Sequence, residues 1–375
     1  MKIQMVDTVS QYQKIQSEVD QAVLEVIRSG RFINGPVVQG FRDHLAAYLG
    51  VEHALSCANG TDALQIALMA LDLQPGDEVI TASFTYVATV EVIALLRLKP
   101  VFVEVEPDTF NLDVAAVEAA ITDKTKAIMP VHLFGQAANM GPLMELARRH
   151  NLYVVEDTAQ AIGSDYTFAD GTKMKTGTIG DIGTTSFYPS KNLGAYGDGG
   201  AIFTRNNGLA TKLWSICNHG SERRYYHDRV GVNSRLDAVQ AAILDIKLRY
   251  LDEYTAARRK AADLYDEMLA DVDALETPFR AGYAEHVFHQ YTLKVKDGRT
   301  RRDALKAKLD EAGIPSMIYY PVPLHLQEAY RYYGYNEGDF PISERLCGEV
   351  ISLPMHSELD ETQQAYIVEH LKKFI

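Results

Sequence analysis

The sequence predicts an α/β fold with a large domain built on a mostly parallel β-sheet and a small C-terminal α+β domain. One observation is an alternation of short apolar runs with helical patterns between residues 54 and 204. Another is a helical pattern over residues 236–269 that contains no Pro or Gly, which is long enough either to be broken in its middle or to connect two domains. With 375 residues, we expect a large domain at 1–245 and, from the long helix onwards, a small domain at 246–375.

Two amphipathic helices are predicted before the alternating pattern begins. Residues 10–30 place Ile15 and Val19 on one stripe and end at a glycine that suits a helix C-terminus. Gly35-Pro36 then starts a second helix, which stops at Gly50.

The alternating pattern predicts the sheet and its covering helices. Strand patterns lie at residues 54–57, 78–84, 101–105, 127–133, 152–155, 184–188 and 200–204. Helical patterns lie at 63–73, 87–98, 114–121 and 142–150. Such an order favours a parallel sheet with helices on both faces, and ligands bind where its strands end. For the small domain we expect strands at 291–295, 316–320 and 350–353 and helices at 301–312 and 361–374.

Charge and cysteine content exclude several classes of protein. The net charge of −13 argues against a nucleic-acid surface. Cys57, Cys217 and Cys347 are isolated, so neither a disulfide framework nor a zinc site is expected. No apolar run approaches the roughly 18 residues of a membrane span, and the first residues lack the pattern of a signal peptide. We therefore predict a cytoplasmic protein without a membrane segment.

The turn Asn59-Gly60-Thr61 opens a predicted helix after a strand. Free backbone N–H groups at a helix start, together with the Thr61 hydroxyl, suit a phosphate ester. The alternative is that Asn59 or Thr61 only caps the helix and Gly60 only makes the turn.

Glu156-Asp157 ends another strand. A carboxylate there could pair with a protonated pyridine nitrogen, and Gln160 is close enough to reach a neighbouring ring substituent. A helix cap or an interdomain ion pair explains the two acids equally well.

Ser186 and Lys191 lie at the end of a third strand, before a glycine-rich stretch. The Ser186 hydroxyl could bind the same phosphate, and the Lys191 amine could form a Schiff base with an aldehyde and later move a proton. A surface loop lysine is the alternative. Together the three strand ends favour a pyridoxal phosphate site. No GxGxxG after a first strand and no GxxxxGK[ST] is present, so an NAD-dependent dehydrogenase is a distant alternative.

Two further segments carry candidate substrate residues. Asn233 and Arg235 stand before the long helix, and the Arg235 guanidinium suits a carboxylate, although both can also serve as capping or ion-pairing residues. Tyr319 and Tyr320 belong to a proline-containing extended segment that lines a pocket or packs the small domain.

The ordered set of motifs resembles the DegT/DnrJ/EryC1/StrS family of sugar aminotransferases, which have the type I fold of pyridoxal phosphate enzymes. The resemblance covers nearly the whole chain. Its motifs are Asn59 to Leu64, Phe84 to Thr89, Glu156-Asp157, Ser186 to Lys191, Gly197 to Ala201, Asn233 to Leu236 and Tyr320 to Pro323.

The resemblance implies a role for each matched residue. Lys191 would be the Schiff-base lysine, and Asp157 would pair with the ring nitrogen. Gln160 would lie near the ring hydroxyl, and Tyr86 would stack on the ring. The phosphate would be held by Gly60, Thr61 and Ser186, and by Asn233 of a second subunit in a homodimer with shared active sites.

Within the family, the chain looks closest to enzymes that aminate C3 of UDP-2-acetamido-2-deoxy-3-oxo-glucuronate for bacterial surface polysaccharides such as the lipopolysaccharide O-antigen. L-glutamate would be the amino donor, and Arg235 would lie near the sugar carboxylate. Tyr319 departs from the histidine that many members have there, and Thr158 replaces a usual alanine. A 3-keto or 4-keto 6-deoxy nucleotide sugar remains an alternative substrate. A regulatory member without turnover is a third class, although such members usually lack the lysine.

Overall fold

A computed structural model describes residues 3–375 and contains a central sheet of seven strands in the order β1-β9-β8-β5-β4-β2-β3. The strands are β1 (His53–Cys57), β2 (Glu78–Ala82), β3 (Lys99–Val103), β4 (Thr125–Met129), β5 (Tyr153–Asp157), β8 (Ile182–Ser186) and β9 (Gly200–Thr204). Strands β3, β2, β4, β5 and β8 run parallel, and β9 is antiparallel to both β1 and β8. The sheet is mostly parallel, as predicted.

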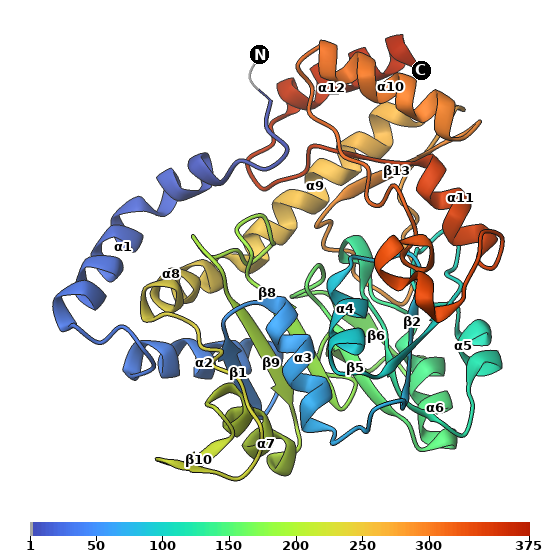
Figure 1. Ribbon diagram of the computed structural model, residues 1–375. Helices are drawn as coiled ribbons and strands as arrows, with labels where there is room; N and C mark the ends of the chain where they lie inside the picture. The colour runs from blue at the N-terminus through green and yellow to red at the C-terminus, as the bar shows by residue number, and fades with distance from the viewer. Residues whose placement is uncertain (1–2) are drawn as a thin grey trace.

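Helices cover both faces of this sheet (Figure 1). One face carries α3 (Gly60–Ala70), α4 (Ala88–Leu95) and α7 (Asn207–Cys217). The other carries α2 (Pro36–Leu49), α5 (Val114–Ala120), α6 (Met140–His150) and α8 (Ala238–Arg249), with α1 (Thr8–Ser29) packed outside α8. These helices bury the apolar side chains of every central strand.

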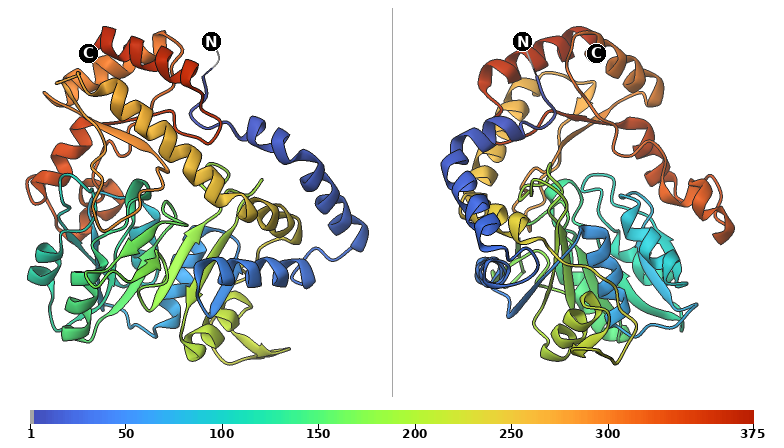
Figure 2. Two further views of the ribbon diagram at one scale, coloured as in Figure 1. Left: turned by 180° about the vertical axis from the view of Figure 1, so that it is seen from behind. Right: turned by 60° about the vertical axis from the view of Figure 1, so that its left-hand side comes forward.

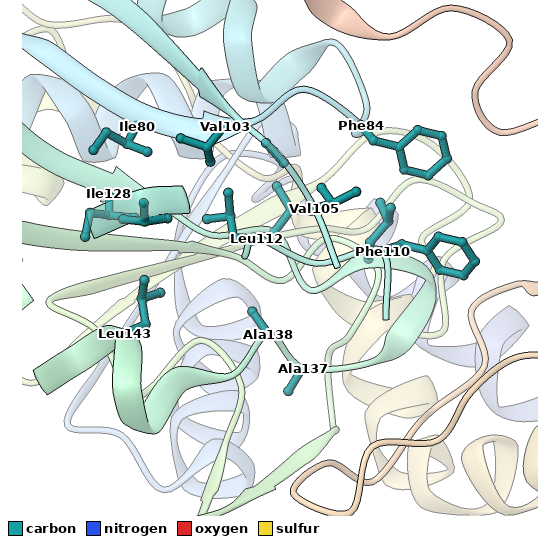
Figure 3. Close-up of a cluster of buried hydrophobic side chains, with 14 of the residues drawn as sticks. Ile80, Phe84, Val103, Val105, Phe110, Leu112, Ile128, Ala137, Ala138 and Leu143 are labelled. Carbon is teal, nitrogen blue, oxygen red and sulfur yellow. The ribbon is translucent and has the colours of Figure 1, made fainter. Parts of the chain in front are cut away.

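Successive residues of a strand point to opposite faces, and the core follows this rule. Val79 packs with α3 and α4, whereas its neighbour Ile80 packs with α6. Figure 3 shows Ile80, Ile128 and Leu143 in the cluster on the α6 face. Because both faces are buried, apolar residues occupy consecutive positions in strands such as β4 and β9 rather than alternating positions.

The C-terminal residues form a second layer at the far end of α9 (Leu251–Leu269) (Figure 2). Its antiparallel sheet contains β12 (Leu275–Glu276), β13 (Tyr291–Val295) and β14 (Val350–Leu353). Helices α10 (Arg299–Glu311), α11 (Pro341–Glu349) and α12 (Glu361–Phe374) accompany it. Ile3 joins this C-terminal core, so the first described residues pack with the last part of the chain. The predicted division near residue 245 stays a proposal.

Two predicted elements were settled by the structure. The helical pattern over 236–269, for which a break in the middle was one expectation, is broken at Tyr250 into α8 and α9. The two helices pack against different parts of the protein: α8 packs on α1 and α2, whereas α9 packs on α12. The strand expected at 316–320 was wrong: only Met317 pairs, in an isolated bridge with Ser352. Pro321 follows this segment, and a residue that cannot donate to a sheet ends such pairing early.

Several short elements carried no sequence prediction. They are the pairs β6 (Asp165–Thr167) with β7 (Lys173–Lys175) and β10 (Ser221–Arg223) with β11 (Tyr226–His227), and the 3₁₀ turns η1 (Leu133–Gly135), η2 (Leu324–Leu326) and η3 (Glu328–Tyr333). Within residues 3–375, no helix combines the length and apolar character needed to cross a membrane.

Candidate active site

A cavity of about 490 Å³ lies where the central parallel strands end. This volume is within the usual range of small-molecule sites. The predicted site residues that line it are Gly60, Thr61, Tyr86, Asp157, Gln160, Ser186, Lys191, Tyr319 and Tyr320. The fold thus brings together side chains that are up to 260 positions apart in the chain (from 60 to 320).

One end of the cavity is built from the start of α3 and the end of β8. The Asn59 side chain accepts a hydrogen bond from the N–H of Asp62 (2.8 Å), which makes Asn59 the cap of α3. The capping alternative is thus observed, and it leaves N–H groups of the first turn available to an anion, since one side chain cannot satisfy all of them. A Cβ on Gly60 would lie 2.6 Å from Cβ of Ser186. Only glycine lets the helix start approach the strand end this closely.

Lys191 lies in the loop after β8 and is partly exposed to the cavity. Burial lowers its pKa to about 8, and the negative charge of Asp157 opposes this shift. An amine with this pKa has a substantial neutral fraction near neutral pH, and the neutral amine is the nucleophilic form. Because its side chain is half-buried at the cavity wall, Lys191 is not a fully solvated loop lysine.

Asp157 is the last residue of β5 and is almost completely buried. One carboxylate oxygen accepts from the Thr89 hydroxyl (3.1 Å) and the other from the N–H of Ala159 (3.1 Å). Burial raises the pKa of Asp157, while the Ala159 N–H and the Lys191 charge oppose the shift. The two donors orient the carboxylate, which leaves it able to accept a proton or a charged N–H from a ligand in the cavity.

Glu156, the neighbour of Asp157, points to the opposite face of the sheet. Its carboxylate accepts from the N–H groups of Gly177 (2.9 Å), Ile179 (2.7 Å) and Gly180 (2.6 Å), and contacts His132 Nε2 at 2.9 Å. The two acids therefore have separate tasks: Glu156 holds a loop, and Asp157 faces the cavity.

Gln160 and the tyrosines form the outer wall of the cavity. The Gln160 side-chain oxygen accepts from the Phe134 N–H (2.7 Å), and its Nε2 donates to the Tyr320 hydroxyl (3.1 Å). The rings of Tyr86 and Tyr320 lie 6.2 Å apart, and Tyr319 lies beside Tyr320. Burial raises the pKa of both Tyr319 and Tyr320, so their hydroxyls stay protonated and can donate.

Sequence reasoning gave no role to several polar residues of the cavity wall, among them Thr85, His289 and Gln290. Thr85 Oγ1, His289 Nδ1 and Gln290 Oε1 are buried without a hydrogen-bond partner among the described residues. Burial lowers the pKa of His289, and the positive charges of Lys191 and Arg258 add to that shift, so its ring is neutral. In the sequence, His289 and Gln290 stand as an isolated His-Gln pair before a strand, and they belong to none of the recognised motifs.

Asn233 and Arg235 are not among the residues that line this cavity. Asn233 is exposed and pairs with Asn218 in an isolated bridge, and Arg235 is half-buried. Within one chain, neither residue reaches the cavity around Lys191, so their predicted roles require a second subunit.

The residues present fit pyridoxal phosphate. The start of α3 and the Ser186 hydroxyl suit its phosphate, Asp157 suits its ring nitrogen, and Lys191 suits its aldehyde. The unpartnered oxygen of Thr85 is a further donor or acceptor for a bound molecule. In contrast, residues 3–375 contain no group of His, Cys, Asp or Glu side chains that could hold a metal ion.

Residues 13–372 match the model of the DegT/DnrJ/EryC1/StrS aminotransferase family. The chain belongs to this family. The family and the transaminase class predicted from the motifs are thereby confirmed, and the dehydrogenase alternative is dropped.

Curated relatives of this family member have several names. A pleiotropic regulatory protein of Geobacillus stearothermophilus is 48% identical over 100% of this chain and 99% of its own length. The UDP-2-acetamido-2-deoxy-3-oxo-D-glucuronate aminotransferase of Pseudomonas aeruginosa is 45% identical, with 96% of each chain covered. The dTDP-3-amino-3,4,6-trideoxy-alpha-D-glucose transaminase of Streptomyces venezuelae is 39% identical over 100% of this chain and 96% of its own.

Solved structures of the family have the same fold. A DegT DnrJ EryC1 StrS aminotransferase from Brucella abortus aligns with a TM-score of 0.93 at 43% identity, over 99% of both chains. NtdA of Bacillus subtilis, solved with its bound cofactor PMP, aligns with a TM-score of 0.87 at 31% identity, over 99% of this chain and 83% of its own. These structures confirm the predicted α/β fold. PMP is the amino form of the predicted cofactor, so this prediction is confirmed through the family.

Proposed function

We propose that this family member uses pyridoxal phosphate to move an amino group from L-glutamate to C3 of UDP-2-acetamido-2-deoxy-3-oxo-glucuronate, for a bacterial surface polysaccharide. The observation that carries the transaminase part is the joint placement of Lys191, Asp157 and the start of α3 around one cavity. Transamination needs a nucleophilic amine, an acid for the ring nitrogen and an anchor for a phosphate, and each is present at a strand end or helix start.

Each residue has a definite task in this proposal. Pyridoxal phosphate, when bound, supplies an electron sink and a carrier for the amino group. The ε-amine of Lys191 holds the aldehyde end and afterwards moves a proton at its Nζ atom, for which a pKa of about 8 is well placed. Asp157 keeps the ring nitrogen protonated, and Thr89 and Ala159 fix the direction of its carboxylate.

The name of the Pseudomonas aeruginosa relative supports the choice of sugar. Arg235 is the residue that we assign to the C6 carboxylate, because a guanidinium binds two oxygens at once. The Streptomyces venezuelae relative supports the alternative of a 3-keto or 4-keto 6-deoxy nucleotide sugar. We further propose a homodimer in which Asn233 and Arg235 complete the cavity of the other subunit.

A second candidate is a regulatory protein that binds the cofactor without turnover. The name of the Geobacillus stearothermophilus relative favours it. Against it stands the presence of Lys191, because the resemblance implies that regulatory members without turnover usually lack this lysine.

The test uses the purified protein and its Lys191→Ala variant. The wild type should have an absorbance band above the protein band that shifts on addition of L-glutamate, and it should aminate the keto sugar. Lys191→Ala should lose at least about 1,000-fold in turnover, because it removes both covalent and proton-transfer roles. Lys173→Ala, which removes an exposed lysine paired with Glu285, is the control. Unchanged turnover in Lys191→Ala would refute the assignment, and a glutamate-responsive band without turnover on any sugar would favour the regulatory candidate.

A further inference from the structure

Behind the outer wall of the cavity, three side chains from distant segments form one chain of hydrogen bonds. Ser83 follows β2, His325 lies in η2 and Glu344 lies in α11. The Ser83 hydroxyl oxygen is 2.6 Å from His325 Nδ1, and His325 Nε2 is 3.1 Å from Glu344 Oε1. These three residues are called the Ser83–His325–Glu344 chain below. None of them lines the cavity itself.

The surroundings fix the direction of these hydrogen bonds. The Glu344 carboxylate already accepts from the N–H groups of Gly338 (2.8 and 3.0 Å) and Phe340 (3.3 Å), so it acts as an acceptor. His325 Nε2 therefore carries a proton and donates it to Glu344. Burial lowers the pKa of His325, although Glu344 opposes this, which favours the neutral ring. Its Nδ1 is then an acceptor for the Ser83 hydroxyl.

The same residue types occur in serine hydrolases, but the burial of Ser83 excludes that chemistry. Ser83 is 0% exposed and His325 is 1% exposed. A nucleophilic serine must meet a substrate carbonyl, which cannot reach a hydroxyl enclosed in this way. The Ser83–His325–Glu344 chain is therefore a structural connection rather than a second active site.

The Ser83–His325–Glu344 chain connects two segments that form the outer wall of the cavity. Ser83 immediately precedes Phe84, Thr85 and Tyr86, and His325 stands five positions after Tyr320. A second bond joins the same segments, since the Leu324 N–H donates to the Ser83 carbonyl (2.8 Å). Nearer the cavity, the rings of Phe84 and Tyr320 lie 6.1 Å apart. Ser83 thus holds the C-terminal segment to the end of β2 through its backbone and its side chain.

The third member attaches this connection to α11. The start of α11 is itself fixed by Glu104, which accepts from the N–H groups of Ile342 (2.8 Å) and Ser343 (2.9 Å). The His325 ring packs edge-on against Phe340, with ring centres 4.7 Å apart. A shift of η2 would break the contacts of His325 with Ser83, Glu344 and Phe340 together. The nearby position of Tyr319 and Tyr320 therefore depends on η2 staying in place.

We propose that Ser83, His325 and Glu344 are positioning residues that set the place of Tyr319 and Tyr320 and thereby the recognition of the keto sugar. This inference rests on the proposed function, because it takes the tyrosine wall as the sugar-binding side. The residues touch neither substrate nor cofactor. They act by holding η2 against β2 and α11, so their loss loosens one wall while the amine of Lys191 stays in place.

Two substitutions of His325 separate the two bonds. His325→Asn places an amide near Nδ1 and keeps the contact with Ser83, whereas His325→Gln places it near Nε2 and keeps the contact with Glu344. We expect His325→Gln to raise the KM for the keto sugar about tenfold, because the bond to the end of β2 is lost. The kcat and the rate of the L-glutamate half-reaction should change less than about twofold. His325→Asn should raise this KM less than about threefold.

Hydrogen exchange gives a readout that needs no substrate. In His325→Gln, residues 317–326 should exchange faster, because the amide of Leu324 bonds to Ser83. His325→Asn should leave that segment near wild type. His370→Asn is the matched control, since this histidine bonds within α12 to the Tyr366 carbonyl, away from the cavity. If His325→Gln fails to fold, Ser83→Ala removes the same bond with a smaller change.

Equal effects of the Asn and Gln variants, or a parallel rise in the KM values for sugar and L-glutamate, would overturn the proposal. A lower melting temperature with unchanged KM and unchanged exchange would also overturn it. Failure of the wild type to aminate any nucleotide keto sugar would refute the proposed function instead. The hydrogen-exchange measurement would still decide whether the Ser83–His325–Glu344 chain orders residues 317–326.

Discussion

The two sides of the cavity are built in different ways. The cofactor side consists of residues at strand ends and at one helix start: Gly60, Thr61, Asp157, Ser186 and Lys191. The outer side consists of residues from loops and from the C-terminal layer: Tyr86, His289, Gln290, Tyr319 and Tyr320. The first set is placed by the central sheet, because its members end a strand or follow one closely along the chain. The second set is placed by packing between segments that are remote in sequence, so small changes there can alter specificity without removing the chemistry.

Replacing the charge at the cofactor side should have the largest effect. Asp157→Asn keeps the shape of the side chain and its contact with Thr89 but cannot keep a ring nitrogen protonated. Turnover should fall about 100- to 1,000-fold, as for the loss of one preorganised electrostatic contact. Steady-state kinetics with a fully loaded enzyme measure this. Asp108→Asn, at an exposed ion pair with Lys294, should have no effect, and a loss below tenfold in Asp157→Asn would weaken the contrast between the two sides.

Closing the gap at the start of α3 should weaken cofactor binding. A Cβ on Gly60 meets Cβ of Ser186 at 2.6 Å, so Gly60→Ala pushes the helix start from the strand end. Overpacking of this kind costs about 1–3 kcal/mol, which corresponds to roughly a 5- to 150-fold higher Kd for pyridoxal phosphate. Fluorescence titration of the cofactor-free protein measures it. Gly40→Ala in α2 has open space around its Cβ, so its Kd should equal that of the wild type.

A buried lysine behind the cofactor side should make stability depend on pH. Lys247 donates to the Gly194 carbonyl (2.5 Å), next to the Lys191 loop, and burial together with Arg258 lowers its pKa to about 7. The folded state then binds fewer protons than the unfolded state between about pH 7 and pH 10.5, so the free energy of unfolding rises with pH there.

Urea unfolding of the cofactor-free protein at pH 7 and pH 9 tests this. The contribution of Lys247 to the rise should be about 2 kcal/mol. Lys247→Met should remove that part, because the neutral side chain does not titrate. Lys260→Met, at an exposed pair with Glu361, should leave the rise intact. If the free energy of unfolding of Lys247→Met rises by the same amount between pH 7 and pH 9, groups other than Lys247 cause the rise.

The smallest effect is expected on the substrate side, at Arg235. Because this residue does not line the cavity of its own chain, Arg235→Ala should leave cofactor binding unchanged. The preference of the variant for a sugar with a C6 carboxylate should fall about tenfold. This change corresponds to a free-energy difference of roughly 1.4 kcal/mol. The ratio of kcat/KM values for matched UDP-sugars with and without that carboxylate measures it. Equal losses on both sugars would remove Arg235 from carboxylate recognition.

Sequence reasoning located the cofactor side better than the outer side for a geometric reason. Asp157 and Lys191 follow apolar runs, and the carboxyl ends of parallel strands meet at one edge of a sheet. The residues before Pro321 also formed a short apolar run, yet they form no strand, since their positions depend on packing against β2 and α11. A local pattern cannot encode such a remote contact.

The sequence by itself determined the family, the parallel sheet and the set of residues at its strand ends, because these follow from local periodicity and from motifs that are continuous along the chain. Only the tertiary structure decided that α8 and α9 separate at Tyr250, that His289 joins the cavity wall, and that Ser83, His325 and Glu344 meet. It also lowered the pKa of Lys191, since burial is a property of the assembled fold. The motifs thus predicted a role for Lys191, whereas the lowered pKa of its amine depends on burial in the assembled fold.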